Sequence, residues 1–129
     1  MEAERTCIDQ NELELWAGVI SHGDIACRQE LFEKYQELAR INAAAMYSKN
    51  WLPTLEYADF YQHAVMGLLE AIDHFDPTIG SNFKSYAYIR IRGSIMKYID
   101  KATEFQEQLA FRRALRQERI NSLIDTESE

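Results

Sequence analysis

The sequence predicts an all-α fold, a compact bundle of four to five helices. Its 129 residues include only five glycines and two prolines, and so few chain breakers favour long helices over many short strands. Apolar residues make up 47% of the chain, which is typical of a globular protein with one modest core. Apolar side chains recur three and four positions apart along most of the chain, as one face of a helix requires.

The first two helices are predicted over about 11–22 and 24–49. Asn11 and Glu14 resemble a capping box at the start of the first helix, and Asp24 can cap the second. The buried stripe expected on the first helix is Leu13, Trp16, Ala17 and Ile20. The face expected on the second helix is Leu31, Tyr35, Leu38, Asn42 and Ala45, widened by Phe32, Ala39 and Met46.

A break over 50–54, which contains Pro53, separates the second helix from a third over about 54–74. The face expected on the third helix is Tyr57, Tyr61, Ala64, Leu68 and Ile72. A tight connection over 75–80 follows, because Pro77 disfavours a helical Asp76 and Gly80 tolerates positive φ.

The fourth helix is predicted over about 82–101. Its inward face is expected to be Phe83, Ala87, Ile91, Ser94, Ile95 and Tyr98. Thr103 with Gln106 is a second capping-box candidate that would open a last helix. The pattern leaves open whether the last two helices join.

The predicted organisation is a flexible N-terminus over 1–10, a helical domain over 11–101, an additional C-terminal helix over 102–124 and an acidic tail over 125–129. No apolar run reaches the ~20 residues that span a bilayer, and the acidic N-terminus does not resemble a signal peptide. A cytoplasmic location is therefore expected, with Cys7 and Cys27 as free thiols.

The sequence gives no reason to expect an enzyme. It contains no GxSxG, P-loop, HExxH or CxxC motif. Two histidine–carboxylate pairs, Asp59/His63 and Glu70/His74, have helical spacing but lack the further ligands of a di-metal bundle. We therefore expect no catalytic residues, no metal site and no cofactor.

The charge distribution is uneven. Residues 82–119 carry nine basic and four acidic side chains, whereas the flanking segments and the chain as a whole, at −7, are acidic. A basic segment of this kind is a candidate surface for DNA phosphates, and the alternative is a solvated helix face. Within it, residues 82–92 interleave three aromatic and three basic side chains, a combination that single-stranded DNA binders use for stacking and phosphate contact. The competing interpretation is that Phe83 and Tyr86 belong to the core.

An ordered set of short motifs covers about two-thirds of the chain. These are Gly23-Asp24, Leu31-Phe32-Glu33-Lys34-Tyr35, Asp59-Phe60-Tyr61-Gln62, Gly67-Leu68-Leu69-Glu70-Ala71-Ile72, Phe75-Asp76-Pro77, Gly80, Phe83-Lys84-Ser85-Tyr86-Ala87 and Ile89-Arg90-Ile91-Arg92-Gly93. With these motifs the run from Leu15 to about Ile99 resembles region 2 of the sigma-70 superfamily and its preceding short segment. It looks closest to the flagellar and sporulation type.

The resemblance implies two partners, core RNA polymerase and promoter DNA. It places polymerase contacts at Asp59, Gln62 and His63, on a helix that docks on the large polymerase subunit. It also implies that aromatic side chains hold a flipped base of the minus-ten element. The DNA-binding residues that it implies are Phe83, Lys84, Ser85, Tyr86, Tyr88, Arg90, Arg92 and Lys97. Gly93 and Met96 would read the upstream edge.

Some positions depart from the family pattern. Ile89-Arg90 replaces the tryptophan pair of housekeeping sigma factors, Ala64 replaces a usual glycine, and His63 replaces a small or acidic residue. After Lys101 the resemblance fades, and the helix-turn-helix domain that would read the minus-thirty-five element is not expected in this chain.

Two functions remain open at this point. One possibility is a partial sigma factor or co-sigma factor, which works with a second protein that supplies the missing domain. The other is a sigma-mimic regulator that binds an anti-sigma factor or another transcription regulator without contacting DNA. In the first case the last helix provides either a docking surface or an extra DNA strip through Arg112, Arg113, Arg116 and Arg119. A purely structural role explains neither the basic segment nor the aromatic residues within it.

Overall fold

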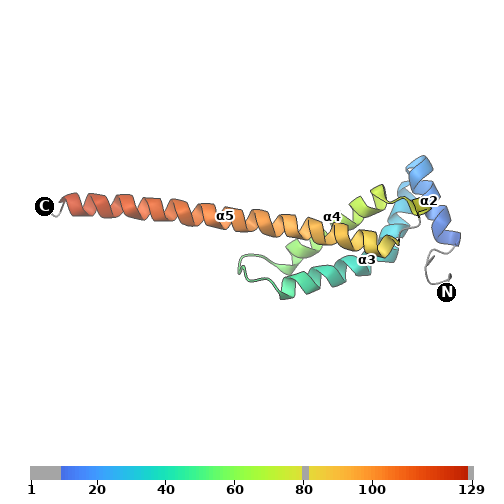
Figure 1. The fold of residues 1–129 in the computed structure, drawn as a ribbon, viewed down its shortest axis with the longest axis horizontal. Coiled ribbons are helices and arrows are strands. Elements are labelled where there is room, and N and C mark those ends of the chain that lie inside the picture. Colours follow the sequence, from blue (N-terminus) through green and yellow to red (C-terminus); the bar gives the residue numbers. More distant parts are fainter. Residues whose placement is uncertain (1–9, 80–81, 128–129) are drawn as a thin grey trace. The chain divides into compact units, whose positions relative to one another are not determined.

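The computed structural model describes residues 10–79 and 82–127, and within these ranges it contains helices and no strand. The elements in chain order are α2 (Gln10–His22), α3 (Ile25–Ser48), α4 (Tyr57–His74), the short 3₁₀ helix η1 (Pro77–Ile79) and α5 (Phe83–Glu127) (Figure 1). The all-α prediction is therefore confirmed. The predictions for residues 1–9, including Cys7, and for Gly80 fall outside the described residues.

The chain divides into two units, and each is described by itself. The first ends at Lys97 and contains α2, α3, α4, η1 and the beginning of α5, and the second begins at Tyr98. In the first unit α3 packs against both α2 and α4. None of the described helices combines the length and the apolar character that crossing a membrane requires.

Polar groups and one glycine set the first helix boundaries. Gly23 has a φ of 59°, in the left-handed region that favours glycine, and it separates α2 from α3. Asp24 then caps α3, because its Oδ1 accepts a hydrogen bond from the Ala26 amide at 2.9 Å. Asn11 lies inside α2, which already includes Gln10, so it is not the predicted N-cap.

The predicted break between α3 and α4 is confirmed, and Asn50 organises it. Its side-chain Nδ2 donates to the Leu52 carbonyl oxygen at 2.8 Å, and the Leu52 amide donates to its Oδ1 at 3.1 Å. Leu52 and Leu55 are buried, whereas Trp51 between them is 73% exposed. Helix α4 begins at Tyr57, three residues later than the expected start at Thr54.

Helix α5 is continuous, which answers the question that the sequence left open. Thr103 lies inside the helix and does not cap a separate one, and the predicted domain limits after 101 and 124 also fall within α5. The reason is local, because no glycine or proline occurs between Ser94 and the end of the chain.

The core of the first unit forms from one face each of α3, α4 and the first turns of α5. Its fully buried apolar side chains include Leu31, Ala39, Phe60, Ala64, Leu68, Ile72, Ala87, Ile91 and Ile95. The expected faces of these helices are thus largely confirmed, although Ala45 on α3 and Tyr57 at the start of α4 are exposed.

The expected stripe on α2 is wrong apart from Trp16. Leu13, Ala17 and Ile20 are exposed, and among residues 11–22 the buried ones are Glu12 and Trp16. A carboxylate takes a core position here because it has hydrogen-bond partners inside the unit.

Candidate functional site

A cluster of aromatic rings fixes the first residue of α5. Phe83 is 2% exposed, and its ring centroid lies 5.0 Å from that of Trp16, 4.6 Å from Tyr35 and 5.1 Å from Phe75. These three rings cover Phe83. Its burial contradicts the expectation that Phe83 stacks on a base, and the competing interpretation, a core residue, is correct for this position.

Local side-chain hydrogen bonds form at Asp76 and Asn82, between the end of α4 and the start of α5. Asp76 Oδ1 accepts hydrogen bonds from the Thr78 hydroxyl at 2.6 Å and from the Thr78 amide at 2.9 Å, and these two bonds lower the pKa of the Asp76 carboxyl. Asn82 Oδ1 then accepts a hydrogen bond from the Lys84 amide at 2.8 Å at the start of α5. Both contacts are local turns that hold the approach to the site.

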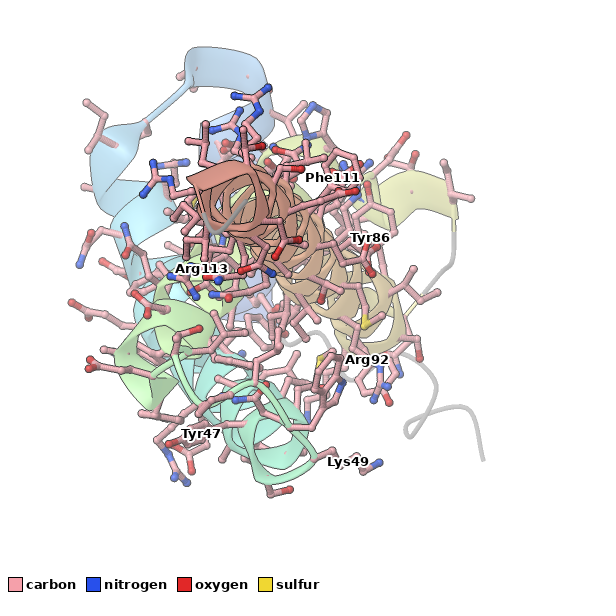
Figure 2. All side chains as sticks on the ribbon, turned by 90° about the vertical axis from the view of Figure 1, so that its left-hand side faces the viewer. Tyr47, Lys49, Tyr86, Arg92, Phe111 and Arg113 are labelled. Carbon is pink, nitrogen blue, oxygen red and sulfur yellow. The ribbon has the colours of Figure 1, made fainter. Side chains whose placement is uncertain are left out.

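Two tyrosine–arginine pairs, each one helical turn apart, lie beyond Phe83 on α5. The guanidinium carbon of Arg90 is 5.2 Å from the Tyr86 ring centroid, and that of Arg92 is 5.2 Å from the Tyr88 ring centroid. Arg92, labelled in Figure 2, also donates a hydrogen bond from Nη1 to the Tyr88 hydroxyl at 2.7 Å. The two pairs therefore hold cationic and aromatic groups together at the surface.

An exposed line of small and apolar residues runs along the outward face of α5. This outer strip consists of Ser85, Ile89, Gly93 and Met96. Their spacing of four, four and three residues aligns them on one helix face, opposite the buried line that starts at Phe83. Tyr86 and Arg90 border the strip on one side, and Tyr88 and Arg92 border it on the other.

Exposure separates the predicted DNA-binding residues into groups. Lys84, Ser85, Tyr88 and Lys97 are exposed, whereas Tyr86, Arg90 and Arg92 are half-buried. Tyr86 also contacts the Phe75 ring, with centroids 5.5 Å apart, so it serves both the core and the surface. Ile89, which is 71% exposed between the two tyrosine–arginine pairs, was not predicted as a site residue. Its only sequence signal is a large apolar residue at a position that helical spacing places opposite the buried face.

The predicted polymerase contacts lie on the outward side of α4. Asp59, Gln62, Met66 and Glu70 follow one another at three- and four-residue spacing and so share one face. Gln62 is exposed, whereas Asp59 and His63 are half-buried, and Asp59 Oδ2 accepts a weak hydrogen bond from the Glu56 amide at 3.4 Å. Met66 is 47% exposed at the centre of this face, and sequence reasoning missed it.

A glycine brings α4 and α5 into close contact. A Cβ atom at Gly67 would lie 2.8 Å from Ile91 Cα and 2.9 Å from the Arg90 carbonyl oxygen. Only a glycine allows this approach, which fixes the face with Gln62 relative to the outer strip. Ala64, one of the departures from the family pattern, is fully buried and therefore lies on the inward side of α4.

The second unit consists of α5 from Tyr98 onward, and none of residues 98–126 is buried. Arg112, Arg113, Arg116 and Arg119 are all exposed. Figure 2 shows Phe111 and Arg113 on different sides of the helix. Within residues 10–79 and 82–127, no group of three or more histidine, cysteine, aspartate or glutamate side chains is placed to hold a metal ion.

The elements α3, α4, η1 and α5 form an all-helical class of domain whose last helix carries an aromatic and basic surface. The family model described as Sigma-70 region 2 matches residues 31–104, more than half of the chain, and the chain belongs to this family. The match begins after α2 and ends inside α5. It therefore starts later than the resemblance predicted from Leu15 and continues beyond Lys101.

Curated relatives agree with this assignment. The chain is 35% identical over 80 residues to the RNA polymerase sigma-B factor of a Nostoc species, an alignment that covers 62% of this chain and 23% of the relative. It is 32% identical over 75 residues to the RNA polymerase sigma factor FliA of Pseudomonas aeruginosa, which covers 57% of this chain and 30% of the relative. A third relative, the RNA polymerase sigma factor SigI4 of Acetivibrio thermocellus, is 27% identical over 71% of this chain and 33% of its own length.

The chain thus spans a third or less of the length of these relatives. The comparisons confirm the predicted family and support a sigma-factor-like role. The flagellar or sporulation subtype stays a prediction, because the relatives carry several sigma-factor names.

Proposed function

We propose that this chain is a promoter-melting unit of a sigma factor, which binds core RNA polymerase through α4 and the minus-ten promoter element through α5. It acts by binding and not by catalysis. It works as a partial sigma factor or co-sigma factor, and another segment or a second protein supplies the contact with the minus-thirty-five element.

The observation that carries this proposal is the outer strip of α5 with its two bordering tyrosine–arginine pairs. An unstacked base needs an apolar surface and the face of an aromatic ring, while its phosphates need cations nearby. Ile89 provides the apolar surface, Tyr88 provides an exposed ring, and Arg92 holds a guanidinium 5.2 Å from that ring. Lys84 and Lys97 add exposed positive charge on either side along the helix.

The proposed polymerase contact is the outward face of α4. Its polar members are Asp59 and Gln62, with His63 at its edge, and the exposed Met66 gives the face an apolar centre. An apolar centre with a polar rim is the usual composition of a protein–protein contact. Because Ala64 is buried, its departure from the family pattern does not alter this face.

Single-stranded DNA binding tests the α5 surface. The variant Tyr88→Ala with Arg92→Ala should weaken binding to single-stranded DNA by roughly 5- to 150-fold, given about 1–3 kcal/mol per stacked base. It should also flatten the dependence of affinity on salt, because a cation near the phosphates is lost. The matched control is Gln117→Ala with Asn121→Ala, another exposed pair one turn apart on α5 that is hydrogen-bonded at 3.1 Å. Equal affinity of the two variants would reject this surface as the DNA site.

Capture on immobilised core RNA polymerase tests the α4 face. We expect Asp59→Ala with Gln62→Ala to lose binding, while Gln29→Ala with Glu33→Ala, an exposed pair on α3, keeps it. If the wild-type chain is folded by circular dichroism yet binds neither polymerase nor DNA, the sigma-mimic function replaces this proposal. Binding to an anti-sigma factor would then be the next measurement.

A further inference from the structure

A buried carboxylate lies in the part of the chain that precedes the family match. Glu12 on α2 is 1% exposed. Its Oε1 accepts a hydrogen bond from Trp16 Nε1 at 3.2 Å and another from the Tyr35 hydroxyl, and its Oε2 lies 2.6 Å from Lys34 Nζ. One side chain therefore has three partners, of which Trp16 lies on α2 itself while Lys34 and Tyr35 join it to α3.

Such a group is not the simplest way to fill a core. Burying a carboxylate is costly, and well-packed apolar residues often replace a buried ion pair without loss of stability. In some proteins, buried charged networks fix one arrangement among several that an apolar core would allow. The geometry that Glu12 fixes is therefore more informative than its contribution to stability.

Two of the residues that Glu12 holds also contact the first residue of α5. Trp16 and Tyr35 each place a ring on Phe83, at 5.0 and 4.6 Å between centroids. Phe83 is the first residue of α5, and the outer strip begins two residues later at Ser85. The Glu12 carboxylate is therefore linked to the start of the outer strip by contacts through the Trp16 and Tyr35 rings and Phe83.

We propose that Glu12 is a positioning residue that orients the first two turns of α5 by fixing the Trp16 and Tyr35 rings against Phe83. Its consequence for DNA binding rests on the function proposed above. The segment that matches the family, residues 31–104, contains neither Glu12 nor Trp16, so the proposed role extends the site to α2.

The test replaces the carboxylate with an uncharged side chain of similar length. In the full chain, Glu12→Met removes all three links, and Glu14→Met is the matched control because Glu14 is exposed on the same helix. Amide hydrogen exchange is measured at residues 83–90 and, as an internal reference, throughout α4. In Glu12→Met, Trp16 Nε1 and the Tyr35 hydroxyl lose their buried acceptor, and their rings no longer hold Phe83 in place. We therefore expect amide exchange at residues 83–90 to rise about tenfold relative to the α4 reference. The control should match the wild type.

Binding provides a second measurement that a general loss of stability would not reproduce. Affinity for single-stranded DNA should fall about tenfold in Glu12→Met, while capture by core RNA polymerase through α4 stays unchanged. If Glu12→Met does not fold, Tyr35→Phe provides the same test, because it keeps the ring on Phe83 and removes the hydroxyl that binds Glu12. We expect the same changes, with smaller amplitude.

The outcomes separate this inference from the proposed function. A uniform rise in exchange through α3, α4 and α5, or no change at residues 83–90, would overturn the positioning role. A local rise at residues 83–90 in a chain whose wild type binds no DNA would uphold the positioning role and reject the proposed function instead.

Discussion

At the close contact of α4 and α5, the substitution Gly67→Ala has two opposing effects on the free energy of unfolding. Gly67→Ala improves helix propensity by about 1 kcal/mol. However, the new Cβ would lie 2.8 Å from Ile91 Cα and 2.9 Å from the Arg90 carbonyl oxygen, whereas ordinary contacts begin at 3.4 Å. The helices must then separate by about 0.6 Å, the difference between 3.4 and 2.8 Å.

The size of the effect follows from what the methyl group meets. Overpacking in a core costs roughly 1–3 kcal/mol, and the upper end applies because backbone atoms, unlike flexible side chains, cannot move aside alone. After the gain in propensity, we expect Gly67→Ala to lower the free energy of unfolding of the first unit by about 2 kcal/mol. For a unit of this size, this loss lowers the melting temperature by roughly 8–16 °C.

The assay is urea unfolding followed by tryptophan fluorescence, since Trp16 is 1% exposed in the first unit. Gly93→Ala is the matched control, because Gly93 lies in the same helix as Ile91 and an added Cβ there meets nothing within 4 Å. It should stabilise the unit by up to about 1 kcal/mol. Equal stabilities of the two variants would show that the helices separate without cost, and the reasoning about their contact would be wrong.

Three further predictions concern residues outside the proposed binding surfaces. Arg28 donates two hydrogen bonds to Asp73 at 2.8 and 2.9 Å and thereby lowers the pKa of the Asp73 carboxyl. Because both side chains are more than a third exposed, Asp73→Asn should lower the free energy of unfolding by only about 0.5 kcal/mol. The pKa of the Asp73 carboxyl is lower in the folded state than in the unfolded state, so the ion pair stabilises the fold above the ordinary pKa of about 3.9 and is lost at more acidic pH. In urea unfolding, the wild type and Asp73→Asn should therefore differ at neutral pH and become equally stable at acidic pH. Burial, followed by the hydrogen bond to the Asp24 carboxylate, raises the pKa of the Cys27 thiol. In a Cys7→Ser background, Cys27 should therefore react with a thiol reagent more slowly at neutral pH than free cysteine does. An equal rate would contradict this expectation. Asn50→Ala removes both side-chain bonds to the loop before α4 and should lower the free energy of unfolding by about 1–2 kcal/mol in the same urea assay, whereas an unchanged midpoint would show that the loop does not need them.

The sequence predicted those features that local chemistry decides. Asp24 caps α3 and Gly23 ends α2 because one side chain and one backbone angle suffice there. The inward faces of α3, α4 and early α5 follow from helical periodicity, since their core residues are apolar.

The errors occur where tertiary partners override the local pattern. The stripe on α2 was wrong because Glu12 enters the core with hydrogen-bond partners that come partly from α3. Phe83 was assigned to DNA by the family resemblance, although its helical spacing had also placed it on the inward face, where three rings enclose it. Met66 was missed because an exposed methionine has no sequence signal other than its position on a face with Gln62.

The lack of burial along the second half of α5 has a thermodynamic consequence. Residues 98–126 contain six large apolar side chains that are at least 40% exposed, namely Phe105, Phe111, Leu115, Ile120, Leu123 and Ile124. A helix without tertiary burial depends on its own hydrogen bonds and is only marginally stable in water. On heating, this half should therefore lose helicity gradually, while the enclosed indole of Trp16 keeps its environment until the first unit unfolds cooperatively. Far-ultraviolet circular dichroism and tryptophan emission would then give different transitions, so this chain has no single melting temperature.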